Sequence, residues 1–224
     1  MMMPFAGGID ANANATLVFS LVAAVIYAFT LSMAPTLARS AAKTLAVAML
    51  AVLAFMHGGP LLLVAALAFS AVGDAFLSRD GETAFLGGLA SFLAAHILYV
   101  ALFLQSGGGL GLLGAESWRG AIALAMAAFG IVMPAALWRR VGPALRLPIG
   151  VYVAAILAMG ISALTTSNLW VIGGAILFMA SDGLLAAERF LLAAISPHRF
   201  WMRYVVWTLY YAAQLAITLG FLLS

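Results

Sequence analysis

Eight long apolar segments, joined by short polar connections, make up most of this 224-residue chain. The apolar runs are continuous and lack the alternating pattern of membrane β-strands. A membrane-spanning helix needs about 20 consecutive, mostly apolar residues. Spans are expected near residues 15–34, 42–56, 61–78, 84–105, 119–138, 148–165, 169–188 and 203–223. The pattern therefore predicts an all-α, polytopic membrane helix bundle, with residues 1–224 forming a single transmembrane domain.

The composition excludes a water-soluble domain of this size. Hydrophobic residues make up 66% of the chain and charged residues only 8%. A soluble domain is about half apolar and a quarter charged. The chain also has no cysteine, so disulfides, thiolate catalysis and a cysteine-bound metal are excluded.

Basic residues concentrate on one side of the predicted membrane. Nine of the ten lie in or beside the odd-numbered connections: Arg39, Lys43, Arg79, Arg139, Arg140, Arg146, Arg189, Arg199 and Arg203. Only Arg119 lies on the opposite side. By the positive-inside rule, both termini are expected outside, which means periplasmic in a bacterial inner membrane. The basic residues behind the net charge of +3 thus indicate membrane orientation, and no nucleic-acid partner is expected.

No basic residue precedes the first apolar run, so this run is expected to be a retained helix and not a cleaved signal peptide.

Two pairs of segments resemble each other within the chain. Residues 70–77 (SAVGDAFL) resemble 179–185 (MASDGLL), and residues 92–96 (FLAAH) resemble 210–214 (YYAAQ). Two parallel four-helix repeats would account for both pairs. The alternative is coincidence between alanine-rich helices.

Two carboxyl groups, those of Asp74 and Asp182, lie inside apolar spans. Each is four to six residues from the inner end of its span, which is about 6–9 Å deep at 1.5 Å per residue. A carboxylate in hydrocarbon costs several kcal/mol unless it is paired, protonated or hydrated. Each aspartate could simply pair with nearby Arg79 or Arg189, but two at matching depth favour a shared site near the cytoplasmic side.

Further polar residues lie within or beside the spans. His96 lies near the middle of the fourth span, either as a neutral structural histidine or at a site. His57 and His198 are expected at opposite membrane edges, so no metal site is predicted.

The eighth span carries a polar face of Tyr210, Tyr211 and Gln214, which serves either helix packing or a pocket wall. Lys43 and Tyr152 lie at the cytoplasmic ends of their spans, where Lys43 is either a topology anchor or a ligand for a lipid phosphate.

Taken together, these segments resemble the lysoplasmalogenase family of multi-pass membrane proteins, the YhhN-like group. The matching pieces are Lys43, residues 73–77, residues 85–99, residues 148–152, Met159, residues 174–182, residues 189–190 and residues 210–214. The resemblance runs in order from about residue 40 to 220. Thr44 departs from it, because the family tends to have proline after the lysine.

The resemblance implies hydrolysis of the vinyl-ether bond of a lysophospholipid substrate, a lysoplasmalogen, to a fatty aldehyde and a glycerophospho-base, without a cofactor. Such a bond is cleaved by protonation at carbon, followed by capture of the oxocarbenium ion by water. That chemistry needs one protonated and one ionised carboxyl group. Asp74 and Asp182 are the expected catalytic pair.

On the same basis His96, Tyr211 and Gln214 are expected to position water or the ether oxygen, with Tyr210 beside them. Lys43 and Tyr152 are expected to hold the phosphate. Two other classes of function remain open from the residues: a small-molecule or lipid transporter that uses the same acidic site, and a non-catalytic scaffold.

Overall fold

The computed structural model describes residues 3–8, 12–193 and 195–224, and these residues form helices without any strand. The helices are α1 (Asn12–Thr30), α2 (Leu37–Met56), α3 (Leu61–Leu77), α4 (Glu82–Ser106), α5 (Leu112–Ala115), α6 (Ser117–Leu137), α7 (Pro143–Ala163), α8 (Leu169–Phe190) and α9 (His198–Leu222). Seven of them are long and apolar enough to cross a membrane, and α3 is a shorter apolar helix of 17 residues. The predicted all-α polytopic membrane bundle is confirmed.

Each of the eight predicted spans corresponds to one long helix, but the helix starts differ. Helices α2, α7 and α9 each begin five residues before the predicted span, at Leu37, Pro143 and His198. Hydropathy falls at the basic residues in these first turns, whereas the helix continues through them. Long basic side chains can cover apolar surface with their stems while the charge reaches the membrane interface.

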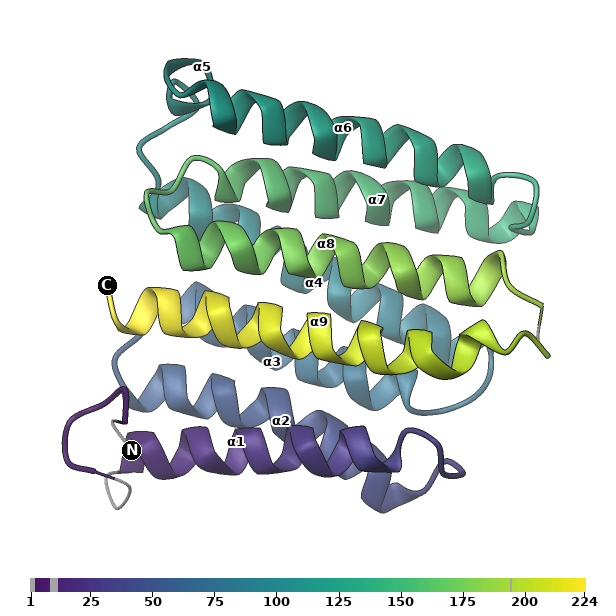
Figure 1. Ribbon diagram of the computed structural model, residues 1–224, viewed down its shortest axis with the longest axis horizontal. Helices are drawn as coiled ribbons and strands as arrows, with labels where there is room; N and C mark the ends of the chain where they lie inside the picture. The colour runs from purple at the N-terminus through teal and green to yellow at the C-terminus, as the bar shows by residue number, and fades with distance from the viewer. Residues whose placement is uncertain (1–2, 9–11, 194) are drawn as a thin grey trace.

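The long helices form an up-and-down bundle in which α2, α3 and α4 lie behind α1, α9, α8 and α7 in the view of Figure 1. In the first half α1 packs on α2, α2 on α3 and α3 on α4. In the second half α6 packs on α7, α7 on α8 and α8 on α9. The halves meet through α4 with α7 and through α2 with α9. These contacts are compatible with two parallel four-helix units, and the internal repeat stays a prediction.

The two ends of the bundle differ in charge. The connections from α1 to α2, α3 to α4, α6 to α7 and α8 to α9 lie at one end, on the right of Figure 1, which we term the basic end. The start of α1 and the end of α9 lie together at the other end. Residues 1–2, at the N-terminus itself, lie outside the described residues.

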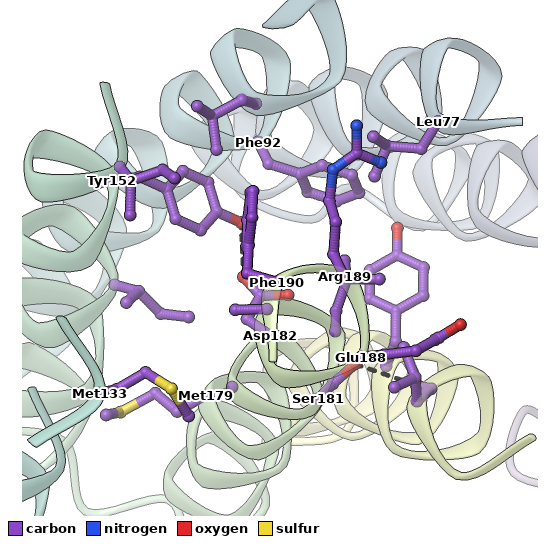
Figure 2. A pocket seen from close by; sticks show the side chains of 18 of the residues that line it. Leu77, Phe92, Met133, Tyr152, Met179, Ser181, Asp182, Glu188, Arg189 and Phe190 are labelled. Atoms are coloured by element: carbon purple, nitrogen blue, oxygen red, sulfur yellow. Dashed lines mark hydrogen bonds between the residues drawn. The ribbon is translucent and has the colours of Figure 1, made fainter. Parts of the chain in front are cut away.

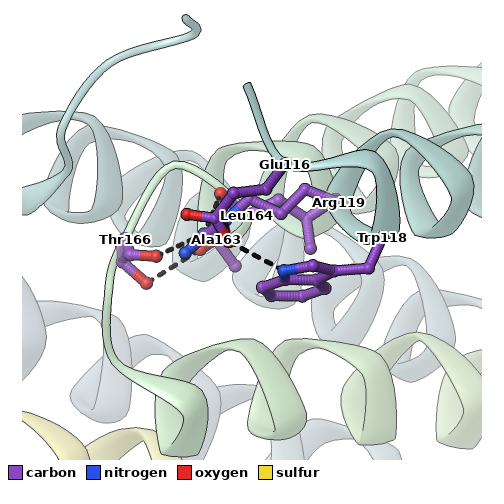
Figure 3. Close-up of polar contacts among 6 residues, drawn as sticks. All are labelled: Glu116, Trp118, Arg119, Ala163, Leu164 and Thr166. Atoms are coloured by element: carbon purple, nitrogen blue, oxygen red, sulfur yellow. Dashed lines mark hydrogen bonds and ion pairs between the residues drawn. The ribbon is translucent and has the colours of Figure 1, made fainter. Parts of the chain in front are cut away.

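At the end opposite to the basic end, Arg119 links the start of α6 to the turn between α7 and α8 (Figure 3). Its Nη1 donates to the carbonyl oxygens of Leu164 at 2.5 Å and Thr166 at 2.6 Å. Its Nε donates to Glu116 Oε2 at 3.0 Å, and the indole of Trp118 donates to the same oxygen at 2.7 Å. The hydrogen bonds from Arg119 and Trp118 lower the pKa of the Glu116 carboxyl group. This buried guanidinium thus satisfies two backbone carbonyls of the turn that follows α7.

Candidate functional site

Asp74 and Asp182 line one cavity of about 280 Å³, whose wall includes side chains from all eight long helices. Asp74 comes from the last turn of α3, and Asp182 lies two turns before the end of α8. Toward the basic end the wall carries the charged side chains Arg39, Lys43, Glu188, Arg189 and Arg203. Between α6 and α7 the wall is apolar, with Phe129, Met133, Leu137, Ile149 and Ile156 among its residues. The cavity is therefore polar toward one end and apolar on one side.

Asp74 is paired with a cation. Lys43 Nζ of α2 lies 3.1 Å from Asp74 Oδ1, and the Tyr210 hydroxyl of α9 donates to Asp74 Oδ2 at 2.7 Å. The side chain of Asp74 is only 1% exposed. A buried carboxylate is tolerated when a cation and hydrogen-bond donors surround it. Lys43 and Tyr210 therefore offset the charge of an Asp74 carboxylate.

Asp182 has a different environment. The Tyr152 hydroxyl of α7 donates to Asp182 Oδ2 at 2.5 Å, and His96 Nε2 of α4 lies 3.9 Å from the same oxygen. His96 is fully buried, and neither of its ring nitrogens has a hydrogen-bond partner among the described residues. No lysine or arginine forms an ion pair with Asp182 within the described part of the chain. Asp182 therefore lacks the lysine partner that Asp74 has.

A cluster of aromatic rings fixes the helices that carry these groups. Phe178, one turn before Asp182 on α8, is fully buried and packs edge-on against Phe92, His96 and Tyr210, with centroids 6.2, 4.9 and 5.4 Å away. Phe92 in turn covers Gly73, where a β-carbon would lie 2.7 Å from the ring. Only glycine lets α3 approach α4 so closely beside Asp74.

The predicted site residues divide into three groups. Lys43, Asp74, Tyr152, Asp182 and Tyr210 line the cavity. His96 lies beside Asp182 but is not among the residues that line the cavity. Gln214 and Tyr211 are turned elsewhere: Gln214 Oε1 accepts from the Tyr99 hydroxyl at 2.5 Å, and the Tyr211 hydroxyl is 2.7 Å from Ser20 Oγ.

The two residues predicted to hold a phosphate each contact an aspartate in this structure. Lys43 is engaged with Asp74, and Tyr152 is engaged with Asp182.

The sequence did not single out Tyr27, Arg39 or Arg189 as site residues, yet all three line the cavity. Arg189 carried a usable signal, because it follows Asp182 by seven residues and therefore shares its face of α8. Tyr27 gave no such signal. Within residues 3–8, 12–193 and 195–224, no three histidine, aspartate or glutamate side chains converge to hold a metal ion.

Comparison with known proteins relates the chain to named enzymes. It is 38% identical over 176 residues to human lysoplasmalogenase TMEM86B, and this alignment covers 73% of this chain and 64% of the relative. It is 32% identical over 167 residues to the lysoplasmalogenase of Mycobacterium tuberculosis, which covers 71% and 59%, respectively. Bos taurus lysoplasmalogenase TMEM86A is 30% identical over 166 residues, covering 69% and 62%. The chain therefore spans about three-fifths of the length of these relatives.

No solved structure matches the chain. The sequence profile of the YhhN family matches residues 38–221, a range that contains both aspartates and every predicted site residue. Because the match covers most of the chain and all of the cavity's carboxyl groups, this protein belongs to the YhhN family.

Proposed function

We propose that this protein is a membrane-embedded hydrolase that cleaves the vinyl-ether bond of lysoplasmalogens into a fatty aldehyde and a glycerophospho-base. The observation that carries the proposal is the pair of unlike carboxyl groups, Asp74 and Asp182, in one cavity with an apolar side. The names of the relatives support the choice of substrate. The apolar wall between α6 and α7 would take the alkenyl chain.

In the proposed mechanism Asp182 is the acid and Asp74 is the base. Tyr152 holds Oδ2 of Asp182, which leaves Oδ1 to carry the proton. This proton is transferred to the carbon of the double bond that is not attached to oxygen. The transfer gives an oxocarbenium ion and the Asp182 carboxylate. Water then adds to the carbon attached to oxygen and gives its proton to Asp74. A low-dielectric site strengthens the stabilisation of the cation by these carboxylates.

Collapse of the hemiacetal returns both carboxyl groups to their starting states. Asp74 donates its proton to the glycerol oxygen as the carbon–oxygen bond breaks, and the Asp182 carboxylate takes the proton of the hemiacetal hydroxyl. The sum of the steps consumes one water and releases the aldehyde and the alcohol. Lys43 keeps Asp74 ionised between turnovers, so we assign Lys43 and Tyr152 to the carboxyl groups and not to the phosphate.

The test is aldehyde release from a lysoplasmalogen by the detergent-purified protein, beside Asp74→Asn and Asp182→Asn. Each substitution removes a proton-transfer group, so turnover should fall by at least about 100-fold, as is usual for general acids and bases. Asp80→Asn, in the exposed α3–α4 connection, is the matched control and should retain activity. Substantial release by either folded site variant would contradict the mechanism. No release by a folded wild-type sample would contradict the substrate.

A further inference from the structure

Arg189 differs from the other basic side chains that line the cavity. Lys43 pairs with Asp74, Arg203 Nε lies 3.1 Å from Glu188 Oε1, and Arg39 Nη1 donates to the Met33 carbonyl at 2.7 Å. The Arg189 guanidinium has no hydrogen-bond or ion-pair partner among the described residues.

Aromatic rings hold Arg189 in place while its N–H donors stay available. The guanidinium carbon lies 3.8 Å from the centroid of the Phe85 ring and 5.9 Å from that of Phe190. Figure 2 shows the side chain extending across the cavity toward Phe92 and Leu77. A guanidinium that stacks on a ring keeps its planar fork of donors free for an oxyanion.

The distance along α8 fits one glycerol unit. Asp182 and Arg189 are seven residues apart, so they lie on the same face and about 10 Å apart along the axis. Long helical side chains lean toward the helix N-terminus, so we expect the Arg189 guanidinium to lie nearer to Asp182 than the helix rise alone would place it. In a lysoplasmalogen the vinyl-ether oxygen and the phosphorus are separated by three carbons and one oxygen, about 6 Å when extended. A substrate with its ether at Asp182 would therefore place its phosphate near Arg189.

The charged side chains on the cavity wall suit an anionic ligand. Four basic and three acidic side chains line the cavity, and two of the acids are already paired with Lys43 and Arg203. We infer that Arg189 binds the phosphate ester of the lysophospholipid and thereby selects substrates that carry a phosphate. This inference rests on the proposed function, because it places the ether at Asp182.

Binding tests the inference without turnover. The probes are a saturated alkyl-ether lysophospholipid and the matching alkylglycerol, which differ only in the phosphate headgroup, titrated calorimetrically into the purified protein. The wild type should bind the lysophospholipid more tightly. Arg189→Gln should weaken that binding at least about tenfold, the loss typical of one charge-assisted contact, and leave alkylglycerol binding unchanged. Arg79→Gln removes an exposed charge from the same end of the bundle, outside this cavity, and should bind as the wild type.

Arg189→Lys keeps the positive charge but lacks the planar guanidinium donors, so it should bind the lysophospholipid with intermediate affinity. This variant also provides the test if Arg189→Gln does not fold. Inorganic phosphate is a further probe: competition that is lost in Arg189→Gln identifies a general phosphate site, and no competition identifies a site that needs the whole lipid. Equal loss of both lipids, or unchanged lysophospholipid binding in Arg189→Gln, would overturn the inference. Absence of aldehyde release would overturn the proposed function and leave the binding result standing.

Discussion

At the scale of single residues, the two aspartates have different partners from neighbouring helices, and this difference supports the unlike roles proposed for them. Lys43 neutralises Asp74, whereas Asp182 has a tyrosine and a histidine beside it. In glycoside hydrolysis, too, one carboxyl group is kept protonated and the other ionised by their surroundings. In the proposed mechanism the two aspartates would likewise act as acid and base, although they are the same kind of side chain.

Tyr152→Phe tests how Asp182 is held. The substitution removes the hydrogen bond to Oδ2 while it keeps the ring that packs on His96, with centroids 5.1 Å apart. We expect aldehyde release to fall about tenfold, which corresponds to about 1.4 kcal/mol of lost transition-state stabilisation. Tyr211→Phe removes a hydroxyl that contacts Ser20 outside the cavity wall, so its rate should stay close to that of the wild type. A larger loss in Tyr211→Phe than in Tyr152→Phe would reverse this assignment.

At the scale of the helices, hydropathy predicts most of the fold because a helix in lipid must be apolar for its whole length. The same signal misses the starts of α2, α7 and α9, since their basic first turns lie beyond the apolar core. It also misses the one-turn helix α5, which is too short for any periodicity to show.

The site was predictable only in part, for a physical reason. An intramembrane carboxylate is costly wherever it lies, so Asp74 and Asp182 stand out in the sequence alone. Their partners depend on which helices pack together. Arg79, close to Asp74 in sequence, does not pair with it, whereas Lys43 from the adjacent helix α2 does. Spacing along one helix cannot supply that information.

Arg119 supports a prediction about the helix connections. Arg119→Gln should lower the thermal unfolding midpoint in detergent, because the carbonyls of Leu164 and Thr166 lose a buried charged donor, at a cost of about 2–4 kcal/mol. The activity of the remaining folded protein should persist, since Arg119 lies at the opposite end from the cavity's charged residues. Glu116→Gln alters an exposed carboxylate and should shift the midpoint much less. Similar midpoints for wild type and Arg119→Gln would show that this contact adds no stability.

At the scale of the whole molecule, the concentration of basic residues at one end supports a prediction of orientation. We propose that the basic end faces the cytoplasm. The chain has no native cysteine, so a single introduced thiol reports its own location. Gly111 and Gly142 lie at opposite ends, and a β-carbon at either would meet open space. A membrane-impermeant maleimide added to intact cells should label Gly111→Cys and not Gly142→Cys, and both should react after permeabilisation. Labelling of Gly142→Cys alone would invert the orientation.

The site is also shared between the halves of the chain. Tyr210, from the second half, donates to Asp74 of the first, and His96, from the first half, lies beside Asp182 of the second. Each carboxyl group thus has one neighbour from the other half, in addition to the one from its own half. Each half alone contains only one of the two aspartates, and that aspartate lacks its neighbour from the other half.

Dividing the chain between Gly109 and Leu110, in the connection between α4 and α5, tests this dependence. We expect fragments 1–109 and 110–224 to copurify when co-expressed, because α4 packs on α7 and α2 packs on α9, and to release aldehyde together. Each fragment expressed alone should release none. The intact chain at equal concentration is the reference for activity. The cut lies at the opposite end from the cavity's charged residues, so it should leave the site of the paired fragments intact. Activity from one isolated fragment would contradict the prediction, because it would mean that a single aspartate with its own half suffices.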